Sequence, residues 1–316
     1  MILVFAETAK GKLKKTSFEV AAYGAKLGEC TAIVLGSADN SELAKLGNYG
    51  IKKVLHVSDN RLDALYSKAY TKAICAAANQ IGTDIIVMAH TSTGKTVAPR
   101  VAIRMQAALL PGVMALPETS GNIRKTVFSG KAFAELQSAS GKKVITVNQN
   151  SYKAEPNSDT AVIEALTVDF NDTDFDYKIL ATEDESGGHI PLPDAEIVVS
   201  GGRGLKGPEN WGIVEDLANA LGAATACSRP VADIGWRPHH EHVGQTGITI
   251  KPTLYIAIGI SGAIQHLAGV NQSKVIVVIN KDPEAPFFKA ADYGIIGDAF
   301  EVLPKITEAV KKLKAS

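Results

Sequence analysis

The sequence predicts an α/β protein of two domains, each built around a mainly parallel sheet. Apolar strand patterns alternate with helical patterns along most of the chain, which is typical of parallel sheets covered by helices. The chain has 316 residues, and a single core rarely grows beyond about 250 to 300 residues, so the length favours two domains. Hydrophobic residues make up 46% of the chain, which is enough to bury both faces of such sheets.

Charge, cysteines and hydropathy exclude several classes of protein. Basic and acidic residues balance at 33 each, so no global field holds a nucleic acid or an anionic membrane. Cys30, Cys75 and Cys227 are widely spaced without a CxxC, which indicates a reducing compartment and three core residues. No apolar run approaches the roughly 20 residues of a membrane helix. Because Met1 leads directly into a strand pattern, we expect no signal peptide and a cytoplasmic protein, or a mitochondrial matrix protein in processed form.

The first domain is predicted from the amino terminus onward as alternating strands and helices. The strands are expected at 2–6, 31–35, 54–57 and 85–89, and the helices at 17–27, 42–46, 65–81 and 97–105. From 112 to 147 the sequence pattern changes to that of short strands with glycines at the turns, and the last of these strands is expected at 143–147. We therefore expect an N-terminal parallel α/β domain with an antiparallel addition.

A linker separates this domain from the second. Residues 150–194 lack a helical period, with strands expected only at 160–170 and 176–180, and 182–193 has the composition of a linker. This places the domains at 1–187 and 188–316. In the second domain we expect helices at 208–221 and 302–313 and buried strands at 197–200, 223–227, 254–258, 275–279 and 293–296.

Each strand of the second domain runs straight into glycine or polar residues. In an open parallel sheet the ligand lies beyond the carboxyl ends of the strands, so these residues converge on one crevice. Arg203 and Arg229 each follow such a strand, and a guanidinium there offers five donors to a ligand. The alternative for both is a surface ion pair.

The segment Gly259–His266 combines a strand end, a two-glycine turn and the start of a short helix. Glycine permits positive φ and close approach of the backbone to a ligand, and a helix amino terminus binds anions such as a pyrophosphate. An ordinary βα turn is the alternative for this motif alone, and His266 alone is more often a structural histidine. Together with the other strand ends, the anion site is favoured.

Three further motifs do not predict a catalytic or metal site. Residues 91–96 read TSTGKT, but Ala89 stands where a phosphate-binding loop needs its first glycine, so a polar loop is expected. The run HHEH at 239–242 lacks a second ligand pair at metal-site spacing. Ser228 and Ser261 lack a nucleophile elbow. No catalytic or metal-binding residues are therefore predicted.

Several motifs in order resemble the alpha subunit of electron transfer flavoproteins. They are SGGRG at 200–204, SRPVADIGW at 228–236, VGQTG at 243–247, GISGAIQHLAG at 259–269, NKDPEAP at 280–286 and ADYGIIGD at 291–298. The resemblance covers the second domain, and LVFAE at 3–7, GKTVAPRVAIRM at 94–105 and VITV at 144–147 extend it more loosely to the first.

The resemblance implies that the second domain is a doubly wound FAD-binding domain and that a beta subunit covers the cofactor in a heterodimer. It implies a redox carrier rather than an enzyme, which takes electrons from flavin dehydrogenases such as acyl-CoA dehydrogenases, in fatty acid β-oxidation, and passes them to a membrane quinone reductase. Carried over by motif, the residues that line the flavin site are Arg203, Ser228, Arg229, Val243, Gly244, Gln245, Thr246, Ser261, Gly262, Ala263, Ile264, Gln265, His266, Asn280 and Asp298.

Individual roles follow from the chemistry of these residues. The turn at 261–264 suits the pyrophosphate or ribityl chain, and Asn280 and Asp298 suit adenosine. Thr246 suits the flavin N5, with Gln245 as a further donor. Arg229 and His266 are the candidates for stabilising negative charge on the reduced ring.

Two other functions remain open from the residues. The first is an enzyme that uses the doubly wound domain to bind NAD or thiamine diphosphate, although the strand ends offer no general acid and base pair. The second is an adenine-nucleotide-binding module in the first domain, with the second domain as a dimerisation element.

Overall fold

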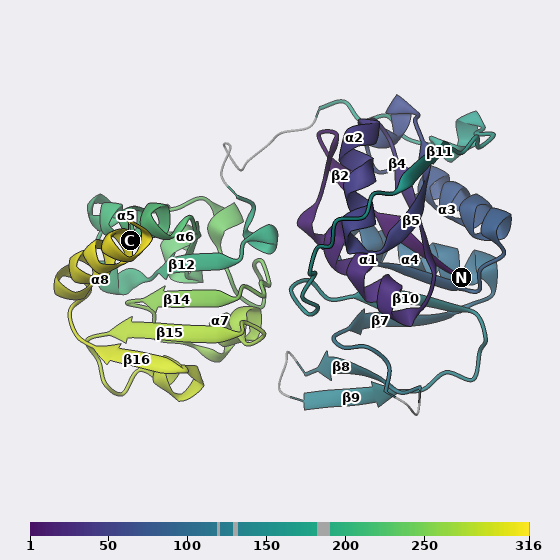
Figure 1. The fold of residues 1–316 in the computed structure, drawn as a ribbon. Coiled ribbons are helices and arrows are strands. Elements are labelled where there is room, and N and C mark those ends of the chain that lie inside the picture. Colours follow the sequence, from purple (N-terminus) through teal and green to yellow (C-terminus); the bar gives the residue numbers. More distant parts are fainter. Residues whose placement is uncertain (119–120, 129–131, 182–189, 316) are drawn as a thin grey trace. The chain divides into compact units, whose positions relative to one another are not determined.

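The computed structural model describes residues 1–118, 121–128, 132–181 and 190–315, which form two compact units (Figure 1). Unit 1 is built from the described residues of Met1–Val127 and Ala132–Ala181, and unit 2 from those of Phe128–Lys131 and Thr182–Ser316. Each unit has its own sheet and its own core. The expected boundary at 187/188 and most of the expected linker lie outside the described residues.

Unit 1 contains a nine-stranded sheet among its described residues, in the order β11-β5-β4-β1-β6-β10-β7-β8-β9. The pairs β7–β8 and β8–β9 are antiparallel and all other neighbours are parallel. The strands are β1 (Ile2–Ala6), β4 (Cys30–Leu35), β5 (Ile51–Val57), β6 (Ile85–Ala89), β7 (Ala108–Val113), β8 (Ile123–Val127), β9 (Ala132–Leu136), β10 (Lys143–Val147) and β11 (Val162–Ala165). A short antiparallel hairpin of β2 (Thr8–Ala9) and β3 (Lys12–Leu13) does not pair with this sheet. The predicted parallel domain with an antiparallel addition is confirmed.

Helices cover both faces of this sheet. Alternate residues of β1 enter different cores: Ile2 and Val4 pack with residues of α1 (Lys15–Leu27), and Leu3 and Phe5 pack with residues of α3 (Ser67–Ile81) and α4 (Ser92–Met105). A central parallel strand is buried on both faces, which explains its unbroken apolar run. The expected helix at 42–46 is divided between α2 (Asn40–Leu43) and a 3-10 helix, Ala44–Tyr49.

Three expectations for unit 1 were wrong in detail. Strand β10 belongs to the parallel part, since it lies between β6 and β7 and pairs parallel with both. Helix α4 begins at Ser92 rather than 97, because the Thr91 hydroxyl accepts a hydrogen bond from the amide of Gly94 at 3.0 Å and caps the helix. No strand forms at 176–180; Tyr177 stacks on Tyr66 instead, with ring centroids 4.7 Å apart.

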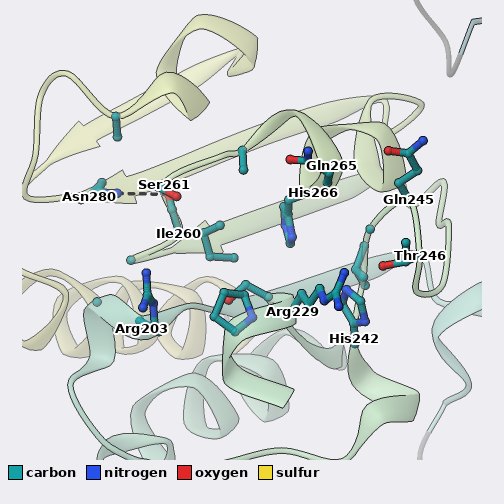
Figure 2. Close-up of a pocket in the computed structure, with 18 of the residues that line it drawn as sticks. Arg203, Arg229, His242, Gln245, Thr246, Ile260, Ser261, Gln265, His266 and Asn280 are labelled. Atoms are coloured by element: carbon teal, nitrogen blue, oxygen red, sulfur yellow. Dashed lines mark hydrogen bonds between the residues drawn. The ribbon is translucent and has the colours of Figure 1, made fainter. Parts of the chain in front are cut away.

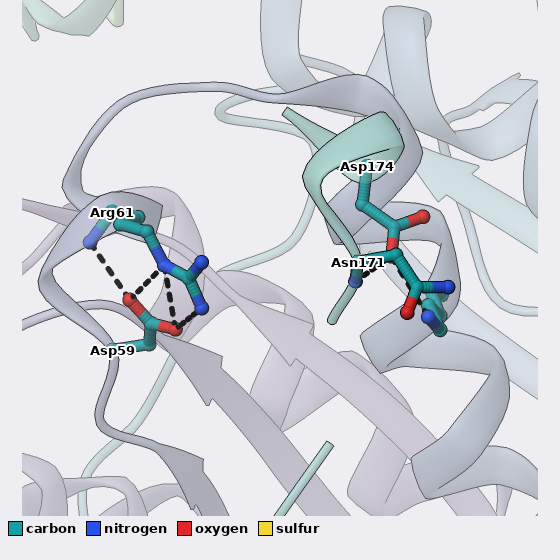
Figure 3. A network of polar contacts seen from close by, with 5 residues as sticks. Asp59, Arg61, Asn171 and Asp174 are labelled. Atoms are coloured by element: carbon teal, nitrogen blue, oxygen red, sulfur yellow. Dashed lines mark hydrogen bonds and ion pairs between the residues drawn. The ribbon is translucent and has the colours of Figure 1, made fainter. Parts of the chain in front are cut away.

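Polar contacts, shown in Figure 3, hold the end of unit 1 against α3 and the turn before it, together with aromatic contacts. The Lys72 ammonium contacts the Asp174 carboxylate at 2.8 Å, and Asp174 closes a capping box with Asn171. Arg61 bonds Asp59 through both its backbone amide and its guanidinium, and its guanidinium lies 4.2 Å from the centroid of the Phe175 ring. The segment around 171–177 is therefore packed rather than extended.

Unit 2 contains a five-stranded parallel sheet in the order β13-β12-β14-β15-β16. Its strands are β12 (Ile197–Gly201), β13 (Ala224–Cys227), β14 (Leu254–Ile258), β15 (Val275–Asn280) and β16 (Tyr293–Ile296). One core cluster contains residues of α5 (Gly212–Leu221), α6 (Arg229–Asp233) and α8 (Ala299–Ala315), and the other contains Val270 of α7 (Ile264–Val270). The strand order reverses between β12 and β14, which makes this pair the switch point of a doubly wound sheet.

Two expectations for unit 2 need correction. Strand β16 forms where predicted but is an exposed edge rather than a buried strand, with Tyr293 66% and Ile296 65% exposed. The expected helix at 208–221 is interrupted at Trp211, where the 3-10 helix Pro208–Asn210 gives way to α5. Within the described part of the chain, no helix combines the length and hydropathy needed to cross a bilayer.

Candidate functional site

A cavity of about 520 Å³ lies at the carboxyl edge of the unit 2 sheet. Figure 2 shows its walls, with His266 of α7 on one side and Arg203 and Arg229 on the other. The lining comes from the segments that follow β12, β13, β14 and β15, together with α7 and the loop 242–246. Four strand ends thus meet at one hollow, as the rule for open parallel sheets requires.

Most of the predicted site residues line this cavity. They are Arg203, Ser228, Arg229, Val243, Gly244, Gln245, Thr246, Ser261, Ala263, Gln265, His266 and Asn280. The remaining three predicted residues, Gly262, Ile264 and Asp298, do not line the cavity. Gly262 is turned to Phe287, whose Cβ lies 2.4 Å from where a glycine Cβ would stand, and Ile264 is 59% exposed. Asp298 caps α8, since its carboxylate accepts the amide of Phe300 at 3.0 Å.

Seven residues outside the predicted list of site residues also line the cavity: Gly204, Pro230, His242, Gly259, Ile260, Asp282 and Ala285. Gly259 and Ile260 belong to the 259–266 segment that was predicted as an anion site. His242 ends the HHEH run, which was not predicted to form a site, but a backbone bridge to Cys227 places it against the sheet and it is 8% exposed. Burial lowers its pKa, helped by Arg229 and His239 and opposed by Asp233. The sequence signal that could have identified His242 as a lining residue is its position immediately before the VGQTG motif.

The Asn280 side chain ties two of the converging segments together. Its amide Nδ2 donates to the Ile260 carbonyl at 3.1 Å, and its Oδ1 accepts the amide of Asp282 at 3.0 Å. This cross-link fixes the spacing between the ends of β14 and β15. Asn280 therefore shapes the wall of the cavity as well as lining it.

Two arginines bring positive charge to the cavity. The Arg203 guanidinium has no hydrogen bond or ion pair with any residue in the described ranges. Arg229 bonds Asp233 through Nε at 3.2 Å, with side chains 62% and 47% exposed, so the pair is weak and screened. Both guanidiniums keep donors for an anionic ligand.

His266 lines the cavity and has a buried ring nitrogen without a hydrogen-bond partner among the described residues. The residue is 7% exposed, its Nε2 lies 2.8 Å from the Tyr255 hydroxyl, and its Nδ1 has no partner among the described residues. Burial, with a smaller contribution from His242, lowers its pKa to about 4. The nearby Val243 backbone opposes this shift. A buried polar atom without a partner is rare in folded proteins and indicates a missing one.

These features fit a dinucleotide cofactor. The arginines and the backbone of the 259–263 turn suit phosphates, while His266, Thr246 and Gln245 suit a polar ring system. Residues of the TSTGKT and HHEH motifs have structural roles: Thr91 caps a helix, and Glu241 pairs with Arg237. The described residues contain no group of three or more His, Cys, Asp or Glu that could hold a metal ion.

Comparisons with known proteins agree with this site. The electron transfer flavoprotein domain matches residues 2–171, and the electron transfer flavoprotein FAD-binding domain matches residues 191–271. The chain is 37% identical to the electron transfer flavoprotein subunit alpha of Bacillus subtilis over 317 residues, covering 99% of this chain and 98% of that protein. The subunit alpha of Thermoanaerobacterium thermosaccharolyticum is also 37% identical, with 99% and 98% covered. A probable mitochondrial subunit alpha from Caenorhabditis elegans is 35% identical, with 98% and 93% covered.

The matched FAD-binding domain contains the cavity residues from 203 to 266 and makes FAD the cofactor. An alpha subunit implies a beta subunit as partner, and its role is to carry electrons rather than to catalyse a reaction on a substrate. The chain belongs to the family of electron transfer flavoprotein alpha subunits.

Proposed function

We propose that this protein holds FAD in a heterodimer with a beta subunit and carries electrons from flavin dehydrogenases, such as acyl-CoA dehydrogenases, to a membrane quinone reductase. The observation that carries the proposal is the cavity at the switch point of unit 2, where cationic and neutral donors converge. A carrier of this kind needs a tuned cofactor site and no acid and base pair for a substrate.

The lining residues divide into two groups by chemistry. Arg203, Ser261 and Ala263 provide charge and backbone donors for the pyrophosphate and ribityl chain. Asn280, held by its bond to Ile260, suits the adenosine part. Asp298, Gly262 and Ile264 lie outside the cavity lining, so we assign them to the scaffold around it.

The second group suits the isoalloxazine. Arg229, His266, Thr246 and Gln245 lie along the cavity from α6, α7 and the 242–246 loop. When bound, FAD supplies the redox chemistry of the subunit. Arg229 and the neutral His266 ring direct N–H donors at the cavity and favour a cofactor that carries added negative charge.

Co-expression with the beta subunit tests the proposal. We expect a yellow heterodimer that loses its visible absorption when an acyl-CoA dehydrogenase and its acyl-CoA substrate are added, and recovers it on addition of a quinone reductase and quinone. A heterodimer without flavin would contradict the cofactor site. A yellow heterodimer that neither dehydrogenase nor reductase affects would contradict the proposed donors and acceptor.

An arginine pair provides a matched control. Arg203→Ala should lower the flavin content of the heterodimer, because it removes a guanidinium from the cavity. Arg100→Ala removes an exposed arginine from α4 of unit 1 and should leave the flavin content unchanged. Equal loss in both variants would show that the effect is not specific to the cavity.

A further inference from the structure

Tyr255 lies behind His266, away from the cavity lining. It comes from β14, its side chain is 0% exposed, and its hydroxyl lies 2.8 Å from His266 Nε2. The residue does not line the cavity and contacts it only through the histidine. The two rings and that of Phe287 pack together, with centroids 5.6 to 6.3 Å apart.

The direction of the hydrogen bond follows from burial. Burial raises the pKa of the Tyr255 phenol well above its ordinary value, so the hydroxyl keeps its proton. The hydroxyl of Ser200 lies nearby and moderates that rise, but it makes no hydrogen bond with any described residue. Among the described residues, Nε2 of His266 is therefore the acceptor for the buried tyrosine proton, and a buried donor left without an acceptor is destabilising.

The tautomer of the histidine follows in turn. Burial keeps the His266 ring neutral at pH 7, and a neutral imidazole has one donor and one acceptor nitrogen. Because Nε2 accepts from Tyr255, the ring proton is on Nδ1, the nitrogen that has no partner. The opposite tautomer would leave Nδ1 with a lone pair in place of a donor.

We infer that Tyr255 is a positioning residue, which holds His266 in the Nδ1–H tautomer so that the ring donates a hydrogen bond to an acceptor atom of FAD. The inference rests on the proposed function, since it takes FAD as the ligand of the cavity. Tyr255 does not contact the cofactor, but through His266 it sets how strongly the site favours the reduced form of FAD.

Tyr255→Phe in the FAD-loaded heterodimer tests this role, because phenylalanine keeps the packing and removes only the hydroxyl. Loss of one neutral hydrogen bond should lower the equilibrium constant for the first one-electron reduction by roughly two- to tenfold, measured by spectroelectrochemical titration. The matched control is Tyr23→Phe in unit 1, which also loses a buried tyrosine hydrogen bond, to the Ala115 carbonyl at 3.1 Å. Tyr23→Phe should leave that constant unchanged.

A double-mutant cycle separates positioning from a general structural effect. In a His266→Ala background the Tyr255→Phe change should have no further effect, because its only route to the cofactor is gone. The same loss in both backgrounds, or no loss in the single variant, would overturn the inference.

The tautomer itself is read by nitrogen NMR of the heterodimer labelled with ¹⁵N-histidine, using His266→Gln to identify the signal. We expect a protonated Nδ1 and an unprotonated Nε2 in the unsubstituted protein, and a proton on Nε2 would overturn the inference. This measurement does not depend on the stability of Tyr255→Phe. A heterodimer that shows the expected tautomer but binds no FAD would instead contradict the proposed function.

Discussion

Gly204 and Gly259 lie backbone against backbone at the mouth of the cavity. The Gly204 amide donates to the Gly259 carbonyl at 3.0 Å, and a Cβ added to Gly259 would stand 2.9 Å from the Gly204 Cα. Gly259 also has a φ of +60°, which residues with a Cβ rarely adopt. The contact joins the segments after β12 and β14, the two strands at the switch point.

Gly259→Ala should therefore destabilise unit 2 and lower its flavin content. The left-handed φ costs about 1 to 2 kcal/mol, and the clash with Gly204 adds about 1 to 3 kcal/mol. Gly235→Ala is the control, since Gly235 has a φ of +77° with nothing within 4 Å of an added Cβ. Both tryptophans, Trp211 and Trp236, lie in unit 2, so denaturant unfolding followed by their fluorescence measures the difference. Equal destabilisation in both variants would contradict a role for the Gly204 contact.

The sequence predicted which strands end at the site because the signals are local. A buried apolar run followed by glycine or arginine marks the end of a strand, and Arg203, Arg229 and Gly259 all follow this pattern. Such signals depend on a few neighbouring residues, and the parallel arrangement then brings the strand ends together without further information.

Side-chain direction and strand order could not be predicted in the same way. Asp298 lies just beyond the end of β16, as Asn280 lies at the end of β15, but the Asp298 carboxylate caps α8 instead of lining the cavity. The place of β10 between β6 and β7 depends on pairing between residues about 35 to 60 positions apart, which no local pattern specifies. His242 was missed because its burial depends on the bridge to Cys227.

The three cysteines should resist thiol reagents in the native protein. Cys30, Cys75 and Cys227 are buried and unpaired, and burial raises the pKa of Cys30 and of Cys227 to about 12. Since only the thiolate reacts, a chromogenic disulfide reagent at pH 8 should modify no cysteine before unfolding and three after it. A thiol that reacts quickly in the native heterodimer would contradict the predicted burial.

The stability of unit 2 should depend on pH through His266. Its folded pKa of about 4 lies below the ordinary value of 6.5, so the unfolded chain takes up the proton first. Stability is therefore lost as the pH falls from about 6.5 to 4, by up to about 3 kcal/mol, and is unaffected by this group above that window.

His266→Gln isolates this contribution. Other groups titrate in the same window, including His242, whose pKa is also lowered by burial, but they are common to both proteins. The difference in unfolding free energy between wild type and variant, followed by tryptophan fluorescence, should shrink between pH 6.5 and 4. A difference that stays constant with pH would show that His266 titrates normally in the folded state.

Arg229 should set the first reduction potential of the bound FAD. Its guanidinium lines the cavity and, among the residues that the structure describes, is paired only through Nε, with an exposed Asp233. A hydrogen bond to a charged group is worth about 1.5 to 3 kcal/mol, and about 1.4 kcal/mol corresponds to roughly 59 mV for one electron. Arg229→Ala should thus lower the first potential by about 60 to 130 mV, as measured by spectroelectrochemical titration of the heterodimer.

Two further variants separate charge from the loss of the ion pair. Asp233→Asn keeps Arg229 and removes its partner, so the first potential should stay the same or rise slightly, because the guanidinium is no longer partly neutralised. Arg229→Lys keeps the charge but loses the planar fork of donors, so its potential should lie between those of wild type and Arg229→Ala. An unchanged potential in Arg229→Ala, or an equal fall in Asp233→Asn, would remove the guanidinium from this role and leave His266 as the remaining donor candidate.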